Sequence, residues 1–191
     1  QCRRLPRRAP RRHRWHHLLG NHDFDVLDEL KAKVPARLGM EQRYRFFDHR
    51  EFRFVILDTN DVSTYAHAAG SSEQIAAAAE LKRLQVAKIR QAKPWNGGIG
   101  AAQLAWFERV CAEAGAARRK VIVLAHHPVA PHNDHNVWNS PAVLTALKNQ
   151  PAVVAWFNGH NHAGHFADHA GVPCVTMHGM VETAATTAFA T

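Results

Sequence analysis

Residues 153–162, Val-Val-Ala-Trp-Phe-Asn-Gly-His-Asn-His, have the pattern of a buried strand that ends in a turn with two histidines. Open α/β sheets bind ligands at the carboxyl ends of their strands, so this turn is a candidate site. His160 and His162 stand two residues apart, a spacing that points side chains the same way in an extended chain. Neutral imidazole is a common ligand of zinc, manganese and iron. Taken alone, the motif suits a metal site and an ordinary turn equally.

Two motifs upstream share this design. Gly20-Asn21-His22-Asp23 follows the apolar stretch His17-Leu18-Leu19, and Ala125-His126-His127-Pro128 follows the run Val121-Ile122-Val123-Leu124. Each apolar stretch reads as a buried strand, and each turn carries side chains able to bind metal. We therefore predict that the three turns meet at one edge of a sheet. The side chains expected to converge there are Asn21, His22, His126, His160 and His162.

Gly-Asn-His-Asp, then His-x-Pro, then Gly-His-x-His, in this order, resembles the calcineurin-like metallophosphoesterase superfamily. The resemblance implies an α/β (α+β) layered sandwich of sheets and helices. The superfamily also carries Asp-x-His and Gly-Asp-x-x-Asp motifs upstream of Gly-Asn-His. In this chain no Asp is followed two residues later by His, and no Gly-Asp pair exists. The chain is therefore expected to adopt an N-terminally truncated form of that fold.

The first fourteen residues differ from the rest of the chain. Seven are arginines and none is acidic; without them, 17 Lys and Arg stand against 16 Asp and Glu, so the formal charge of +8 belongs to an arm. The remainder, residues 15–191, is predicted to be a partial metallophosphoesterase domain. Residues 1–14 have three interpretations, in order of preference: a scar of truncation or of a reading-frame error, a disordered tail, and an arm that binds nucleic acid or acidic lipid. We expect them to pack against nothing.

Composition also excludes several classes of protein. The three cysteines form neither a disulfide framework nor a Cys-x-x-Cys site, which fits a reducing compartment. No apolar run approaches the length of a membrane span, and the opening stretch lacks the apolar core of a secretory signal. A cytoplasmic protein without a membrane partner is expected, and the near-neutral body makes nucleic acid a poor partner for the domain.

Periodicity and turn residues predict alternating strands and helices. A short helix is expected over residues 25–33, ending before Pro35, and a pair of strands over residues 44–47 and 52–57. The later elements expected along the chain are helices over 71–92, 101–114 and 142–148 and strands over 120–125, 152–157, around Phe166 and over 172–177. The apolar positions Ile75, Leu81, Leu84, Val86 and Ile89 indicate the first of these helices.

Several other side chains have both a structural and a functional interpretation. Asp58 and Asp61 stand at a strand exit, where capping of the loop is preferred to metal ligation. Trp95 is expected in the core, with a place over a ligand as the alternative, and Cys111 is assigned to packing. Solvent exposure is expected for the loop histidines His132, His135, His165, His169 and His178.

The resemblance also implies roles for individual residues. Asn21, through its amide oxygen, would hold one metal together with His126 and His160, and His162 would hold a second. His126 is preferred to His127 because His-x-Pro is the superfamily spacing. His22 would stabilise phosphoryl oxygens or protonate the leaving group, with Asp23 as its orienting acid. The centre would be binuclear, with manganese first and iron, zinc or cobalt as alternatives.

Further segments narrow the resemblance. Trp95-Asn96-Gly97-Gly98, Gln103-Leu104-x-Trp106 and the C-terminal residues 179–191 look like the Mn²⁺-dependent ADP-ribose/CDP-alcohol diphosphatases. That family implies a phosphohydrolase for a small nucleotide-type substrate, cleaving the pyrophosphate of ADP-ribose or of CDP-alcohols. In the superfamily, the Asp-x-His and Gly-Asp-x-x-Asp motifs supply the Asp that bridges the two metals and two further ligands. Because this chain lacks both motifs, we expect the 191-residue chain to bind metal weakly and to be inactive. The alternatives are a calcineurin-like phosphoesterase for cyclic nucleotides or phosphomonoesters, and a non-catalytic interaction module.

Overall fold

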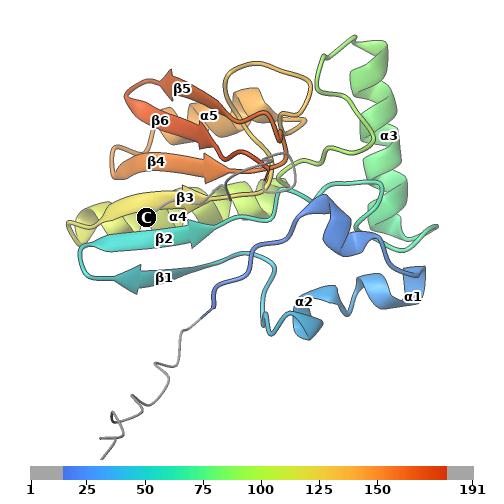
Figure 1. The fold of residues 1–191 in the computed structure, drawn as a ribbon, viewed down its shortest axis with the longest axis horizontal. Coiled ribbons are helices and arrows are strands. Elements are labelled where there is room, and N and C mark those ends of the chain that lie inside the picture. Colours follow the sequence, from blue (N-terminus) through green and yellow to red (C-terminus); the bar gives the residue numbers. More distant parts are fainter. Residues whose placement is uncertain (1–14, 180–191) are drawn as a thin grey trace, which may run out of the picture.

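The structure, a computed structural model, describes residues 15–179 and consists of one mixed sheet with helices packed against it (Figure 1). The α/β layered class predicted from the sequence is confirmed. The strands are β1 (Arg45–His49), β2 (Phe52–Ile56), β3 (Lys120–Leu124), β4 (Val153–Asn158), β5 (His165–His169) and β6 (Val172–Thr176). The helices are the 3₁₀ helix η1 (Asn21–Phe24) and the α-helices α1 (Asp28–Lys31), α2 (Val34–Arg37), α3 (Ser72–Val86), α4 (Ala101–Ala116) and α5 (Ser140–Lys148).

The order of the strands explains where the site forms. The sheet runs β1-β2-β3-β4-β6-β5, with β2, β3, β4 and β6 mutually parallel and the two edge strands antiparallel to their neighbours. All four parallel strands therefore end at the same edge. The loops that leave this edge begin at Leu57, Ala125, Gly159 and Met177, and in sheets of this kind that edge is where ligands bind.

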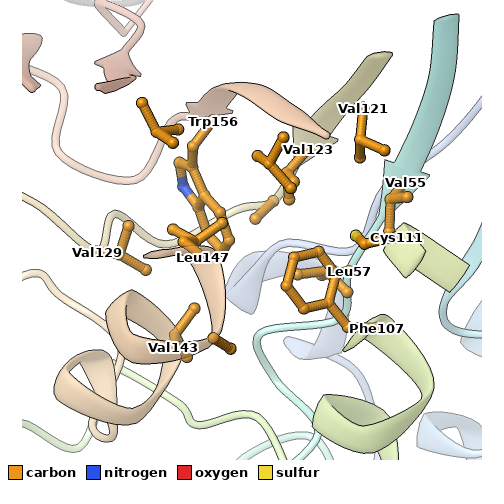
Figure 2. Close-up of a cluster of buried hydrophobic side chains, with 14 of the residues drawn as sticks. Val55, Leu57, Phe107, Cys111, Val121, Val123, Val129, Val143, Leu147 and Trp156 are labelled. Carbon is orange, nitrogen blue, oxygen red and sulfur yellow. The ribbon is translucent and has the colours of Figure 1, made fainter. Parts of the chain in front are cut away.

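The main core lies between the sheet and the helices α4 and α5. Figure 2 shows Phe107 and Cys111 of α4 and Val143 and Leu147 of α5 facing the sheet. Trp156 of β4, fully buried, fills the space on the sheet side. Burial of each large apolar side chain of this kind contributes about 1.5–3 kcal/mol. The assignment of Cys111 to packing is confirmed, since burial also raises the pKa of its thiol to about 12.

Helix α3 ends at Val86, six residues earlier than predicted. Lys88 adopts a left-handed φ of 56°, and the N–H of Ile89 donates to the carbonyl of Leu84, which closes the helix in a Schellman turn. Because a lysine and not a glycine occupies the left-handed position, the sequence carried no stop signal. Of the apolar positions that indicated this helix, Ile75, Val86 and Ile89 are exposed, and the buried face consists of Ala77, Leu81 and Leu84.

The helix predicted over residues 25–33 is replaced by the two short helices α1 and α2. Pro35 lies in the first turn of α2 and does not end a helix. Proline is tolerated there because the missing N–H has no acceptor within the helix. The other predicted elements are confirmed, with ends that differ by one or two residues.

The apolar stretch before Gly20 is not a strand, which corrects the expectation of a strand before each motif. Within residues 15–179, no strand pairs with residues 15–20. Instead they cross the sheet face opposite α4: the ring of His16 stacks on Phe47 with 3.7 Å between centroids, and the carbonyl of His17 accepts a hydrogen bond from Arg45. Leu19 is fully buried in a separate small cluster with Phe24 and Met40.

The expectation for residues 1–14, and the predicted similarity of residues 180–191, lie outside the described residues. Among residues 15–179, no helix combines the length and apolar character that a membrane span requires.

Candidate metal centre

Three side chains from distant parts of the chain meet at the carboxyl edge of the sheet. Nε2 of His126 lies 2.8 Å from Oδ1 of Asn21 and 3.1 Å from Nδ1 of His160. His126 follows β3, His160 follows β4, and Asn21 begins η1. An oxygen donor and a nitrogen donor thus both lie close to Nε2 of His126, and the three atoms form the donor set predicted for the first metal.

A cavity of about 380 Å³ opens over these donors. Its lining residues are Asn21, His22, Trp95, His126, His135, His160, Asn161, His162 and Ala163. The predicted convergence of the three motifs on one edge is therefore confirmed. A larger hollow of about 560 Å³ adjoins it and shares His22 and His126.

His160 is held in an unusual backbone conformation. Its φ is 64°, in the left-handed region that a residue with a β-carbon adopts at a cost of about 1–3 kcal/mol. Its ring is fixed from the outer side by Asn96, whose Oδ1 lies 2.9 Å from Nε2 of His160. The turn thereby aims Nδ1 of His160 at His126.

The two neighbouring histidines of the second motif have different surroundings. His127 is fully buried, its Nδ1 lies 2.6 Å from the hydroxyl of Thr59, and its Nε2 lies 3.4 Å from the carbonyl oxygen of Trp95. The ligand nitrogens of His126, His127 and His160 lie within 4.8 Å of one another, so His127 is near enough to join a metal site. However, both of its ring nitrogens are already hydrogen-bonded to protein groups, whereas Nε2 of His126 faces the other donors. These contacts support the assignment of ligation to His126.

Burial keeps the three clustered imidazoles neutral. It lowers the pKa of His126 to about 4 and that of His160 to about 3, and it lowers the pKa of His127 well below the usual range, with the neighbouring histidines adding to the effect in each case. A neutral imidazole has a free lone pair, which a cation requires of a ligand. The site is therefore ready to bind metal at neutral pH without losing a proton first.

This burial predicts a pH-dependent stability. Above pH 6.5 both folded and unfolded chains hold these histidines neutral; as the pH falls below that value, only the unfolded chain gains the protons, and stability is lost towards the folded pKa values of about 4 and 3. Each histidine contributes up to about 1.4 kcal/mol per pH unit. Urea unfolding of the metal-free protein should show a lower midpoint at pH 5 than at pH 7. His160→Gln should reduce the slope, and equal midpoints at both pH values would contradict the prediction.

His22 and Asp23 are not partners in the structure. The exposed ring of His22 lines the cavity, and its Nδ1 lies 2.6 Å from Oδ2 of Asp25, a residue that the sequence analysis did not single out. Asp23 instead accepts a hydrogen bond from the backbone N–H of Gly20 at 2.8 Å and so closes the start of η1. The acid that can orient His22 is therefore Asp25.

His162 lies at the exposed rim of the cavity. The backbone N–H of Gly179 donates to the carbonyl of His162, and a β-carbon on Gly179 would come within 2.7 Å of the His162 ring. A glycine at 179 thus allows this ring to pack against the exit of β6.

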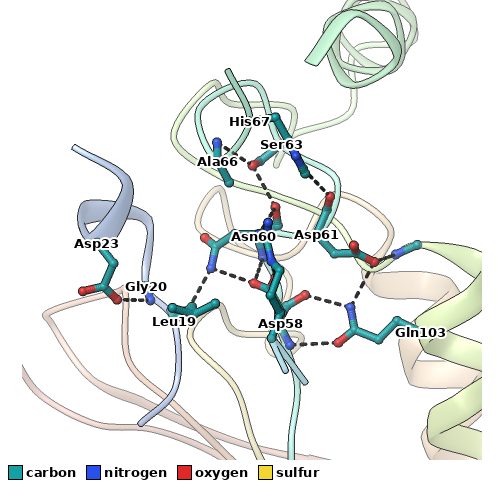
Figure 3. A network of polar contacts seen from close by, with 12 residues as sticks. Leu19, Gly20, Asp23, Asp58, Asn60, Asp61, Ser63, Ala66, His67 and Gln103 are labelled. Carbon is teal, nitrogen blue, oxygen red and sulfur yellow. Dashed lines mark hydrogen bonds and ion pairs between the residues drawn. The ribbon is translucent and has the colours of Figure 1, made fainter. Parts of the chain in front are cut away.

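Asp58 and Asp61 cap loops, as the sequence analysis preferred. Figure 3 shows Asp58 within a polar network, where it accepts from the backbone N–H and the side-chain amide of Asn60. Arg43 forms an ion pair with it at 2.5 Å; burial raises the pKa of Asp58, and Arg43 opposes that shift. Asp61 accepts from the N–H of Gly100 and the amide of Gln103 at the start of α4. Neither carboxylate lines the cavity.

Sequence reasoning missed three residues of the site. Trp95 was expected in the core, with a place over a ligand as the alternative; it is 44% exposed and lines the cavity, which favours the alternative. His135 was grouped with exposed loop histidines, yet its ring lies 5.5 Å from that of His160. Asn96 was named only within a segment that resembles a family, and its contact with His160 was not predicted. The segment with Trp95 and Asn96 carried a family resemblance but no indication of a place in the site, because these residues and His135 come from two loops that meet only in the folded chain.

Gly97 shows how tightly the loop with Trp95 and Asn96 is seated. A β-carbon at Gly97 would lie 2.3 Å from the carbonyl oxygen of Thr59. Gly97→Ala is therefore expected to displace the loop and lower the free energy of unfolding by about 1–3 kcal/mol, measured by urea denaturation. Gly159→Ala is the matched control, because nothing lies within 4 Å of a β-carbon there. Equal stability of the two variants would contradict the close approach.

The donors present fit one divalent cation. Amide oxygen with two imidazoles suits manganese, iron, cobalt or zinc. No carboxylate occurs among the residues lining this cavity in the described chain, residues 15–179. A bridge between two cations about 3.5–4 Å apart is therefore not supplied by these residues.

Comparison with known proteins agrees with this geometry. A model of the calcineurin-like phosphoesterase family matches residues 2–164. A Xenopus tropicalis protein named manganese-dependent ADP-ribose/CDP-alcohol diphosphatase is 29% identical over 88% of this chain and 60% of its own length, and an Arabidopsis thaliana protein of the same name is 31% identical over 82% and 56%. A crystal structure of a dimetal phosphatase from Danio rerio superposes with a TM-score of 0.76 at 25% identity, over 88% of this chain and 62% of that one. The chain thus spans about 60% of the length of such relatives.

Proposed function

Because the chain belongs to the calcineurin-like phosphoesterase family, we propose that it forms the metal-binding part of a phosphohydrolase that cleaves nucleoside-diphosphate-linked substrates such as ADP-ribose and CDP-alcohols. The observation that carries this proposal is the meeting of Asn21, His126 and His160 at one point of the cavity. The names of the curated relatives supply the substrate class.

Each residue has a defined role in the proposed reaction. Asn21, His126 and His160 hold one divalent cation, preferably Mn²⁺, and a bound cation would supply charge that polarises the phosphoryl oxygens. His162, at the rim, is assigned to hold a second cation together with carboxylates, none of which lines this cavity within residues 15–179.

His22 stands beside the same donors without belonging to them. Its ring is exposed in the cavity and its Nδ1 is paired with Asp25, so Nε2 is the nitrogen left for the substrate. We assign it to stabilise phosphoryl oxygens or to protonate the oxygen of the leaving phosphate, with Asp25 as orienting acid. Asp23 keeps the turn in shape, because its carboxylate is bonded to the N–H of Gly20.

The remaining assignments concern the cellular location, the substrate and the first fourteen residues. A cytoplasmic location is proposed because Cys111 and Cys174 are buried free thiols. The substrate is a small molecule, and nucleic acid is not required as a partner. The first fourteen residues are proposed as an arm outside the catalytic domain.

A substrate panel tests the proposed function. The 191-residue chain should be compared with the same chain extended by an N-terminal segment that carries Asp-x-His and Gly-Asp-x-x-Asp. With Mn²⁺, the extended protein should hydrolyse ADP-ribose and CDP-alcohols faster than cyclic nucleotides or phosphomonoesters. A preference for cyclic AMP or p-nitrophenyl phosphate would favour the related phosphoesterase activities, and no turnover of any substrate despite two bound ions would favour a non-catalytic module.

A further inference from the structure

Asn96 is fully buried, and its hydrogen bonds prevent a flip of the side-chain amide that would exchange Oδ1 and Nδ2. Its Nδ2 donates to the carbonyl of Gln91 at 2.9 Å and to the carbonyl of Asp134 at 2.7 Å. A primary amide has two N–H donors, and both are used. Reversing the amide would place its oxygen against two carbonyl oxygens, so the orientation with Oδ1 towards His160 is determined by the surrounding backbone.

That orientation determines which nitrogen of His160 carries the proton. Oδ1 of Asn96 is an acceptor, and it lies 2.9 Å from Nε2 of His160. In the neutral ring Nε2 must therefore carry the hydrogen, which leaves the lone pair on Nδ1. Nδ1 is the atom that lies 3.1 Å from Nε2 of His126, on the side of the donor cluster.

We propose that Asn96 is a positioning residue that fixes His160 as its Nε2–H tautomer and so presents Nδ1 as a metal ligand. The inference rests on the proposed metal site, but it concerns a residue with no contact to the cation. Without the acceptor, a buried Nε2–H would be left unsatisfied, which costs about 1–3 kcal/mol. The ring could then shift its proton to Nδ1 and donate it to His126, which would remove the lone pair that the cation needs.

The chain offers a matched control for the structural part of this role. Asn136 is also fully buried, and its Nδ2 donates to the carbonyls of Val129 and Pro131. Its Oδ1, unlike that of Asn96, has no hydrogen-bond partner among the described residues 15–179. Loss of either amide should loosen a loop, whereas only loss of Asn96 should affect His160.

Three variants separate positioning from stability. The tautomer of His160 is read in the metal-free protein from long-range ¹⁵N–¹H couplings of the ring, and binding of Zn²⁺ is measured by calorimetry. Asn96→Leu should lose the pure Nε2–H form and weaken Zn²⁺ binding by about 10–100-fold. Asn96→Asp, which keeps the acceptor but loses both donors, should retain the tautomer and most of the affinity at reduced stability. Asn136→Leu should lower stability and change neither the tautomer nor the affinity.

Two results would overturn the proposal: an Nδ1–H tautomer of His160 in the wild-type protein, or an equal loss of Zn²⁺ affinity in Asn96→Leu and Asn136→Leu. The tautomer is measured without metal or substrate, so it tests Asn96 independently of turnover. If the tautomer responds as expected while the extended protein hydrolyses nothing, the proposed function fails and the positioning role stands.

Discussion

Replacing His126 with alanine is expected to abolish divalent-metal binding by the chain, while replacing His127 with alanine should leave the affinity within about tenfold of wild type. The two residues are adjacent and both lie near His160, and the sequence separates them only through the His-x-Pro spacing. Nε2 of His126 faces Asn21 and His160, whereas both nitrogens of His127 are bonded to Thr59 and Trp95. Replacing His126 removes the nitrogen that lies close to both Asn21 and His160.

Calorimetric titration with Zn²⁺ and Mn²⁺, at a pH near 7 where both imidazoles are neutral, measures this difference. Circular dichroism and urea unfolding should accompany it, because His127→Ala leaves a buried cavity and is expected to cost stability. In the extended enzyme described above, the same contrast should appear in hydrolysis of ADP-ribose. Metal binding that survives in His126→Ala and disappears in a folded His127→Ala would assign the ligand to the other histidine.

Adding an N-terminal segment that carries the missing carboxylates is expected to raise both the number of bound metal ions and the rate of hydrolysis. Asn21, His126 and His160 are neutral donors, so a dication among them keeps its full charge, and no bridging oxyanion lines the cavity in residues 15–179. We therefore expect at most one weakly held ion in the 191-residue chain, with negligible hydrolysis of ADP-ribose or CDP-alcohols. A single electrostatic contribution to catalysis is worth about 10²–10³ in rate, and several are missing together.

Metal analysis with a diphosphatase assay on the two proteins tests this expectation. The form extended with Asp-x-His and Gly-Asp-x-x-Asp should bind two ions and show Mn²⁺-stimulated turnover. An extension with those aspartates changed to asparagine is the matched control and should restore neither. Two tightly bound ions and full turnover in the 191-residue chain would mean that residues such as Asp58 or Asp61 leave their capping bonds to serve as ligands, and this account of the site would be wrong.

Much of the architecture was predictable because its signals are local. Strands such as residues 120–124 and 153–158 are short apolar runs bounded by turn residues, and α4 has buried residues at helical spacing. Parallel strands end at a common edge, so motifs at the ends of β3 and β4 had to converge. The position of His126 and His160 in one cavity follows from these patterns alone.

Helix ends and the first motif were less predictable. The Schellman turn at Lys88 depends on a left-handed residue that is usually glycine, and here the bonds to Leu84 and Gln85 outweigh the preference of the side chain. Leu18 and Leu19 have the composition of a strand, yet a strand also requires a neighbour with free hydrogen-bonding groups. Composition carries no information about that neighbour.

The finer geometry of the site was decided only by tertiary structure. The contact between Asn96 and His160 joins residues 64 positions apart, and that between Thr59 and His127 joins residues 68 positions apart. Asp25 replaces Asp23 beside His22 because η1 turns the nearer carboxylate back to the N–H of Gly20. The sequence by itself therefore determined which side chains could bind metal and at which edge of the sheet they gather. Which nitrogen of each histidine faces the cation depends on hydrogen bonds between loops, and these form only when the packed core brings the loops together.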